Sequence, residues 1–237
     1  MKPDGAMSPK AADWPHWIPV FPLPNAVLMP MSVLPLNVFE KRYRIMTRDA
    51  LASHRMIAIA LLETGFESKY DTLEAPIHPV VCVGRILREE RLEDGRYNFL
   101  LQGLNRAQIV EENRELSYRR AHLRVLHPQP LQPEVERTYR SELLRMLSEE
   151  PLVQLARRGG WMELFRCHDL AFSDLVDVLA ATVLRCCEDK QQFLSEPRVF
   201  ERVRCLCDLL EELSMELREL RERPARVRAW PPVLSEN

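Results

Sequence analysis

Glycine and lysine are both scarce in this sequence. Only seven glycines occur among the 237 residues, none of them is followed by lysine, and lysine itself occurs five times. A phosphate-cradling loop of the pattern G-x-x-x-x-G-K-[ST] is therefore absent. The sequence thus lacks this means of binding a nucleotide, and we expect no cofactor.

Long hydrophobic runs are missing as well. No stretch of about 18 apolar residues occurs, and the first 17 residues, MKPDGAMSPKAADWPHW, contain no apolar core of a signal peptide. We therefore expect neither a membrane-spanning helix nor secretion. The sequence predicts a cytoplasmic protein that has no membrane partner.

The six cysteines lack the spacing of a disulfide framework or of a zinc site. They include the adjacent pair Cys186 and Cys187 and the C-x-C of Cys205 and Cys207, whereas structural zinc favours two ligands separated by two to four residues. In Cys167-His168-Asp169, neighbours on a helix point about 100° apart and cannot form a catalytic pair. We therefore expect reduced thiols, no metal site and no catalytic residue.

Proline, in contrast, is abundant, and five prolines fall within residues 18 to 46, IPVFPLPNAVLMPMSVLPLNVFEKRYRIM. Residues 18 to 126 otherwise alternate in the manner of short strands, with a bulge or bend expected at Gly84 and a hairpin turn at Asp94-Gly95. One helix is expected in this half, capped by Asn37 and extending to Ala50. These patterns predict a small, mostly antiparallel β domain with a single packed helix.

After HPQPLQP, residues 127 to 133, the hydrophobic period changes from about two to about 3.6. Helices are predicted at 134–148, 152–158, 161–169 and 174–186, the last of these capped by Ser173. A final long helix is expected to begin at Ser195 and Pro197 and to end at Pro224. Its apolar seam has heptad spacing: Val199, Val203, Leu206, Leu210, Leu213, Leu217 and Leu220.

Several of these stretches resemble the N-terminal substrate-binding domain of Lon-type ATP-dependent proteases, in the form found as short, free-standing bacterial proteins. They are PVFPL (19–23), VLMP (27–30), LPLNVFEKRYRIM (34–46), VGRI (83–86), RYNFLLQGLNR (96–106), DLVDVLA (174–180), DKQQFL (189–194) and ERV (201–203). The resemblance implies an α+β fold, in which a PUA-like, mostly antiparallel β-barrel is followed by a helical bundle.

The expected organisation is a disordered tail at 1–16, the PUA-like domain at 17–127, the helical bundle at 128–223 and a C-terminal tail at 224–237. The ATPase and peptidase modules of a Lon-type protease have no counterpart in this sequence, which predicts a protein that is not an enzyme. Where the family usually has glycine after the proline of its V-L-F-P-G turn, Met31 follows Pro30. A residue with a Cβ resists positive φ, so this turn must differ or carry strain.

From this resemblance we expect a non-enzymatic module that binds unfolded or extended, partly apolar polypeptide segments. It would act as an adaptor or regulator in protein quality control, with a protease or chaperone as its partner. Because strands interrupted by proline cannot all be central, part of the segment at 18–36 is expected at a sheet edge. The candidate peptide-binding residues are Phe21, Leu23, Val27, Leu28, Met29, Met31 and Leu34. The same residues could instead form the core of the β domain, and the sequence leaves both interpretations open.

The alternative function is RNA binding, because PUA-like barrels elsewhere bind RNA. Its candidate residues are Arg42, Arg44, Arg85 and Arg88. Acidic residues are interspersed with these arginines, which favours a solvated, ion-paired surface over a phosphate-binding face. Binding to polypeptides is therefore the preferred interpretation.

Overall fold

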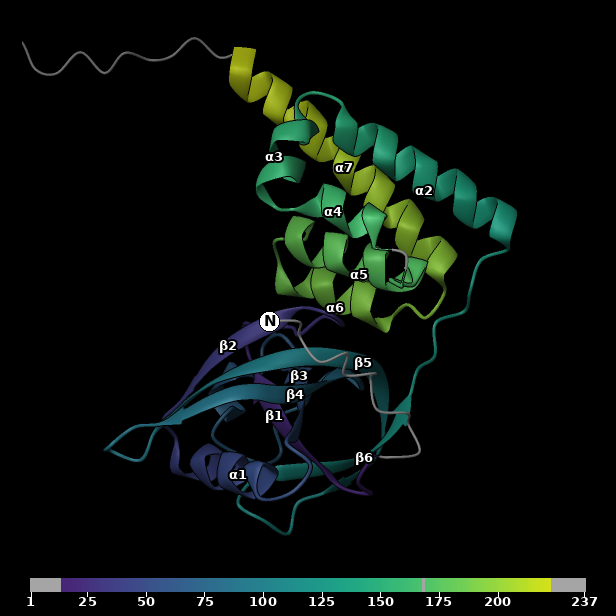
Figure 1. The fold of residues 1–237 in the computed structure, drawn as a ribbon. Helices are drawn as coiled ribbons and strands as arrows, with labels where there is room; N and C mark the ends of the chain where they lie inside the picture. The colour runs from purple at the N-terminus through teal and green to yellow at the C-terminus, as the bar shows by residue number, and fades with distance from the viewer. Residues whose placement is uncertain (1–13, 168, 223–237) are drawn as a thin grey trace, which may run out of the picture.

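The computed structural model describes residues 14–167 and 169–222, and within them every strand precedes residue 126 while all but one of the α-helices follow residue 132. The strands and helix α1 form the lower lobe in Figure 1, and the later helices form the upper lobe. The change of hydrophobic period near residue 130 therefore coincides with a change from sheet to helices. The domain boundaries themselves stay a prediction, because one hydrophobic cluster continues through both lobes.

The lower lobe contains one six-stranded sheet with the order β2-β5-β4-β3-β1-β6. All pairings are antiparallel except β1 with β3, and β6 also pairs with β5, so that only β2 has a single neighbour. The mostly antiparallel α+β fold is thus confirmed. The strands are β1 (Ile18–Leu23), β2 (Val33–Val38), β3 (Met56–Leu61), β4 (Val80–Arg91), β5 (Tyr97–Asn113) and β6 (Arg119–Val125).

The local signals in this half explain its register. The predicted hairpin connects β4 to β5, and Gly95 adopts a φ of 81° in its turn, a value that costs glycine little. The β4–β5 register shifts next to Gly84, where a bulge or bend was predicted, but the unpaired residue is Leu104 on β5, between Asn105 and Gly103. In β1, Pro19 pairs only with β6 and Pro22 only with β3. At each of these prolines the strand therefore has a neighbour on one side only. Proline is tolerated there because its missing N–H does not break a hydrogen bond to a second strand.

The turn that leads into β2 is strained at Met31. Met31 has a φ of 63°, its N–H donates to the Gly103 carbonyl at 2.9 Å, and the Gly103 N–H donates to the Ser32 carbonyl at 2.8 Å. A Cβ on Gly103 would lie 2.1 Å from the Met29 carbonyl oxygen, so only glycine allows this close approach. The turn keeps the left-handed conformation with methionine in it, at a typical cost of about 1–2 kcal/mol.

This strain can be measured by comparing two variants that both remove the Met31 side chain. Met31→Gly is expected to be more stable than Met31→Ala by about 1 kcal/mol, because only glycine adopts positive φ without a steric cost. Urea unfolding of both variants gives the difference. Equal stabilities would show that the backbone at this position is not strained.

Helix α1 (Lys41–Leu51) begins later than predicted, and the expected Asn37 cap is wrong. Asn37 lies in β2, where its side-chain amide donates to the Asn98 side chain at 2.6 Å. Glu40 occupies the N-cap position but makes no side-chain cap; its carboxylate accepts from Tyr70 Oη at 2.9 Å and from Arg42 Nε at 3.0 Å. Pairing of 33–38 as a strand took precedence over the local cap. Glu40 instead links the start of α1 to the loop before β4 through its hydrogen bond with Tyr70.

The upper lobe is a bundle of six helices within the described residues: α2 (Pro133–Ser148), α3 (Leu152–Arg158), α4 (Trp161–Arg166), α5 (Phe172–Val183), α6 (Cys187–Ser195) and α7 (Val199–Glu222). Helix α6 was not predicted. Two predicted caps are wrong, because Ser195 ends α6, where its hydroxyl donates to the Gln191 carbonyl, and Ser173 lies inside α5. The seam of α7 is buried as far as Leu210, half-buried at Leu213 and Leu217, and exposed at Leu220.

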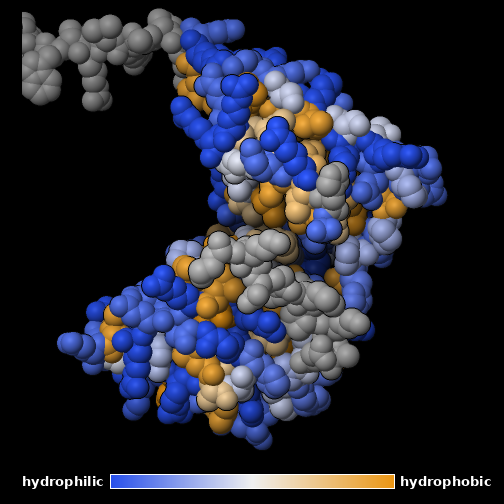
Figure 2. Space-filling view, viewed as in Figure 1, coloured by the Kyte–Doolittle hydropathy of each residue, from blue (hydrophilic) through white to orange (hydrophobic). Residues whose placement is uncertain are grey.

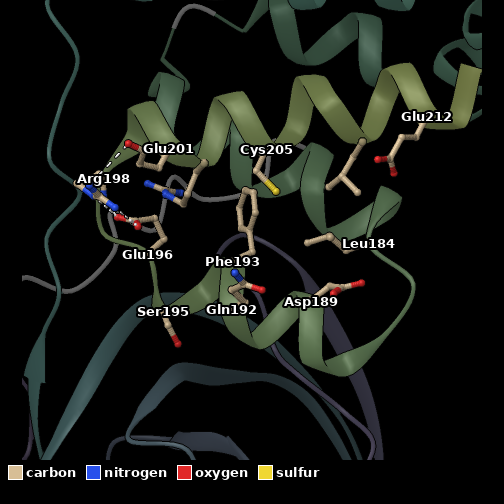
Figure 3. Close-up of a pocket in the computed structure, with 12 residues that line it drawn as sticks. Leu184, Asp189, Gln192, Phe193, Ser195, Glu196, Arg198, Glu201, Cys205 and Glu212 are labelled. Carbon is tan, nitrogen blue, oxygen red and sulfur yellow. Dashed lines mark hydrogen bonds and ion pairs between the residues drawn. The ribbon is translucent and has the colours of Figure 1, made fainter.

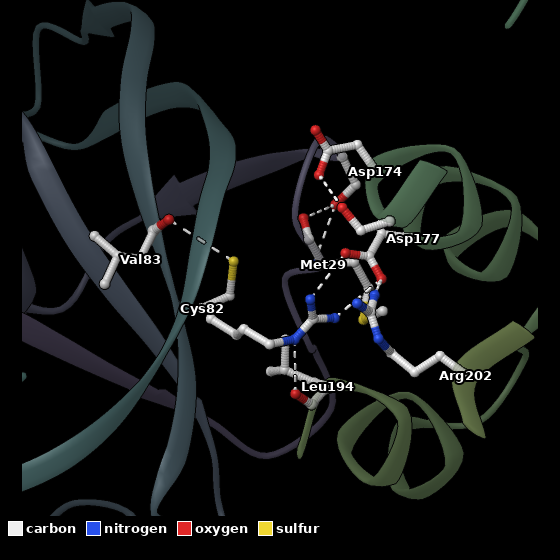
Figure 4. Close-up of polar contacts among 10 residues, drawn as sticks. Met29, Cys82, Val83, Asp174, Asp177, Leu194 and Arg202 are labelled. Carbon is white, nitrogen blue, oxygen red and sulfur yellow. Dashed lines mark hydrogen bonds and ion pairs between the residues drawn. The ribbon is translucent and has the colours of Figure 1, made fainter. Parts of the chain in front are cut away.

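A buried ion-pair network joins the two lobes (Figure 4). The guanidinium of Arg106 on β5 donates to both carboxylate oxygens of Asp177 on α5, at 2.9 and 3.0 Å, and its Nε donates to the Leu194 carbonyl at 3.0 Å. Arg202 on α7 also pairs with Asp177. All three charged side chains are at most 3% exposed, and burial lowers the pKa of Arg202 from its usual value. Asp177 therefore holds together elements from both halves of the chain.

Candidate functional site

A depression of about 570 Å³ lies over the free end of the sheet, where β2, β5 and β4 run side by side. Its lining residues form three rows across the strands. The rows are Pro35–Leu100–Arg88, Leu36–Phe99–Glu89 and Asn37–Asn98–Glu90. Side chains of the first and third rows lie on the solvent side of the sheet, because successive residues of a strand point to opposite faces. We call this surface, with Val33 and Leu87, the outer sheet face.

Apolar side chains are unusually exposed on the outer sheet face. Val33 is 48% exposed, Leu87 50% and Leu100 38%. Leu87 stands beside Arg88 because the β4–β5 register shifts between Ile86 and Arg88, and such a bulge turns consecutive side chains towards one face. On the side of the molecule seen in Figure 2, hydrophobic surface on the lower lobe is broken into separate patches by hydrophilic side chains. The register places these residues near one another, because Val33 pairs with Gln102, two residues from Leu100, and Leu87 precedes Arg88, which pairs with Leu100.

The edge of β2 next to this patch carries free backbone groups. Ser32 accepts from Gly103, and the antiparallel alternation then directs the N–H and C=O groups of Val33, Pro35 and Asn37 away from β5. Pro35 has no N–H to leave unpaired. Among the described residues, β2 has no second strand neighbour. An extended chain could therefore pair with Val33 and Asn37 as an added strand.

The structure divides the seven predicted peptide-binding residues into two groups. Phe21, Leu28 and Met29 are at most 5% exposed and belong to the hydrophobic core, so a bound peptide cannot reach them in this conformation. Leu23, Val27, Met31 and Leu34 are half-buried. Of these, Leu34 lies in β2 on the face opposite to the patch, and none of the seven lines the depression.

The four predicted RNA-binding arginines lie on two different elements. Arg42 and Arg44 are on α1, and Arg85 and Arg88 are on β4. The Arg42 side chain is only 14% exposed and pairs with Glu40 at 2.9 Å. Arg88 is exposed but is followed directly by Glu89 and Glu90. This arrangement gives little net positive charge for a phosphate backbone.

The residues that line the depression were largely missed in the sequence, with Arg88 as the exception. In the structure, 33–38 alternates exposed with less exposed residues, and Leu100 is exposed between the buried Phe99 and Leu101. The apolar run VLPL and the sequence around Leu100 gave no sign of these exposures. What the sequence could not give was the register that aligns Pro35 with Leu100 and Arg88. Tertiary pairing, rather than local pattern, creates this site.

The chemistry of the depression is that of a binding surface. Its lining offers amide, carboxylate, guanidinium and apolar groups but no serine, cysteine or histidine. Glu89 is engaged with Arg55, whose hydrogen bonds lower the pKa of the Glu89 carboxyl. In residues 14–167 and 169–222, no cluster of three or more His, Cys, Asp or Glu side chains could hold a metal ion. No described helix is long and apolar enough to cross a membrane.

The chain matches the family model of the ATP-dependent protease La (LON) substrate-binding domain over residues 17–212. It is 26% identical over 208 residues to a Lon protease of Anaeromyxobacter dehalogenans, a match that covers 84% of this chain and 23% of the relative. A Lon protease 2 of Herpetosiphon aurantiacus is 29% identical over 197 residues, which cover 82% of this chain and 24% of the relative. The chain therefore spans about a quarter of the length of these curated relatives.

Two solved structures share the fold. The N-terminal domain of a Mycobacterium avium complex Lon protease superposes with a TM-score of 0.59 at 22% identity, over 83% of this chain and 98% of that one. A Lon N-terminal domain protein from Xanthomonas campestris gives a TM-score of 0.55 at 22% identity, over 80% and 96% of the two chains. The PUA-like arrangement implied by the sequence is consistent with both neighbours.

Proposed function

The chain belongs to the family of ATP-dependent protease La (LON) substrate-binding domains, and from this premise we propose that the outer sheet face and the open edge of β2 bind extended, partly apolar segments of other polypeptides. The observation that carries the proposal is the combination of an unpaired strand edge with an exposed apolar patch beside it. Backbone pairing supplies affinity for any extended chain, and the patch selects apolar side chains.

The geometry suits a segment in which apolar and polar residues alternate. Side chains of an added strand that point to the outer sheet face would contact Val33 of β2 directly. Leu100 on β5 and Leu87 on β4 lie one and two strands further in, so they would be contacted by the part of the bound polypeptide that crosses the outer sheet face. Exposed apolar patches of this kind often mark interaction sites. Asn37 and Asn98, whose amides already pair with each other, give the depression a polar end. A folded protein, whose strands are already paired, would offer no such segment.

The proposed role is that of a non-enzymatic adaptor or regulator in cytoplasmic protein quality control. The family model covers a substrate-binding domain, and no serine, threonine or cysteine that could act as a peptidase nucleophile lines the depression. In this role the chain presents a captured polypeptide to a protease or chaperone. No step of bond cleavage is assigned to it.

The test is the double variant Leu87→Ser with Leu100→Ser. Both side chains are exposed, so we expect the thermal midpoint to change little, while affinity for a permanently unfolded polypeptide falls about tenfold or more as two apolar anchors are lost. Fluorescence anisotropy with a labelled, reduced and carboxymethylated protein measures the affinity.

The matched control is Val110→Ser with Met215→Ser, which removes two side chains of similar exposure, 55% and 56%, away from the depression. It should bind as the wild type does. Equal loss of binding in both variants would refute the assigned site. Tighter binding of structured RNA than of unfolded protein, weakening steeply with salt, would instead support the RNA alternative.

A further inference from the structure

A second groove lies in the bundle, between α6 and α7, with a volume of about 620 Å³ (Figure 3). Four of its lining residues occur on α7 at i, i+3, i+7 and i+10, and so form one stripe along the helix. They are Arg202, Cys205, Leu209 and Glu212. At a rise of 1.5 Å per residue the stripe is roughly 15 Å long. An extended chain of four to five residues has about this length.

The floor of the groove is apolar but contains unsatisfied hydrogen-bond donors. Phe193, Leu184 and Leu209 supply apolar surface. Arg202 is only 1% exposed; its Nη1 pairs with Asp177, whereas its Nε and Nη2 have no hydrogen-bond partner. The Phe193 ring centroid lies 6.0 Å from the Arg202 guanidinium carbon, which offsets part of the desolvation. Buried donors without an acceptor are costly, so this end of the groove favours a ligand oxygen.

The other end of the groove is acidic. Asp189 on α6 and Glu212 on α7 both line it (Figure 3), and neither forms an ion pair among the described residues. A smaller depression of about 210 Å³ shares Asp189, Glu212, Leu184 and Leu209, and beyond them Glu216 is paired with Arg185 at 3.2 Å, so the unpaired carboxylates here are Asp189 and Glu212. Unpaired carboxylates over an apolar floor favour a cation with an alkyl stem, such as the side chain of arginine or lysine.

We propose that the α6–α7 groove is a second docking site, for a short extended polypeptide segment whose basic side chain lies between Asp189 and Glu212. At 1% exposure the Arg202 guanidinium is not reached in this conformation, so binding moves its side chain enough for a main-chain carbonyl oxygen of the segment to accept from it. Glu196 and Glu201 line the same end and both pair with Arg198. Because this end therefore offers no free positive charge, a neutral carbonyl suits it as well as a carboxylate. Glu196 is already engaged by Arg198, at 2.7 and 2.8 Å.

This site is separate from the outer sheet face and selects different chemistry. No residue lines both the groove and the sheet depression. The outer sheet face selects apolar side chains, whereas the groove selects positive charge. The two sites together would let the chain discriminate between extended segments by the position of a basic residue.

The experiment uses an acetylated and amidated pentapeptide of leucine and alanine with one arginine, labelled for fluorescence anisotropy, and a twin in which neutral citrulline replaces arginine. The full chain should bind the arginine peptide about fivefold to tenfold more tightly than its twin. Asp189→Asn with Glu212→Gln should remove this preference at an unchanged thermal midpoint. The control Asp208→Asn with Glu219→Gln makes the same change of charge on exposed positions of α7 outside the groove, and should keep the preference.

Three results would overturn the proposal. The first is equal binding of the two peptides, and the second is an equal loss of preference in both double variants. The third is binding that appears only after truncation at Glu222, which would make the chain's own residues 223–237 the occupant. Leu87→Ser with Leu100→Ser should leave the peptide preference intact. Failure of the outer sheet face as a site would therefore not affect this result.

Discussion

Asp177→Ala is expected to lower the free energy of unfolding by about 3–5 kcal/mol. The substitution removes the carboxylate that pairs with both Arg106 and Arg202 and leaves two guanidinium groups buried without a counter-charge. Removal of one partner of a buried ion pair costs far more than the pair contributes net, because the remaining charge has lost its hydration. Since Arg106 is on β5 and Asp177 on α5, the contact between the lobes should weaken as well.

Urea unfolding followed by circular dichroism measures this loss. The matched control is Asp174→Ala, one turn earlier on α5, which removes the same charge but makes no ion pair among the described residues (Figure 4). Burial raises the pKa of the Asp174 carboxyl, so its ionised form is not favoured by the fold, and this variant should lose less than about 1 kcal/mol. Similar losses in the two variants would contradict the assigned role of Asp177.

Met29→Ala is expected to cost about 2–5 kcal/mol, the range for large-to-alanine substitutions in a core. Met29 is 1% exposed and packs in the cluster that also contains Leu28, Phe21 and Tyr43. Its carbonyl accepts from the Ser32 hydroxyl at 2.7 Å, so the backbone around it is also fixed. The cavity left by the side chain cannot be filled by movement of the turn.

The thermal midpoint and unfolded-polypeptide affinity should both be measured for Met29→Ala. We expect the midpoint to fall strongly and the affinity of the folded variant to stay unchanged. Met31→Ala, at a half-buried neighbour, serves as the comparison and should lose less stability. A stable Met29→Ala variant with weakened binding would place Met29 on the binding surface and contradict its assignment to the core.

The contrast between Met29 and Met31 shows where sequence reasoning reached its limit. The prolines correctly predicted that part of the segment at 18–36 lies at a sheet edge, because Pro35 is in β2, the strand with a single neighbour. Which apolar side chains face inwards depends on the conformation of the turn at 28–32. In this turn the Met29 carbonyl packs against Gly103 of β5, where a side chain would not fit. A contact across about 70 residues of sequence cannot be read from local alternation.

Local signals were reliable where no distant contact competed with them. Asp94-Gly95 formed its hairpin and residues 152–158 formed a helix as predicted. Asn37 failed as a cap because pairing with Asn98 was available. Helix α6 was missed because few of its residues are both buried and apolar. Another of its buried residues is Gln191, whose side-chain amide donates to the Val80 carbonyl at 2.8 Å. Its hydrophobic pattern is weak for that reason.

Hydrogen–deuterium exchange on the intact chain tests the central claim most directly, because it reports which backbone amides a bound polypeptide covers. A permanently unfolded polypeptide added at saturation should slow exchange at Val33 and Asn37, whose N–H groups point away from β5, while residues 119–125 of β6 should be unaffected. Binding without slowed exchange in 33–38, or protection confined to 133–222, would contradict the assignment of β2 and the outer sheet face as the polypeptide-binding site.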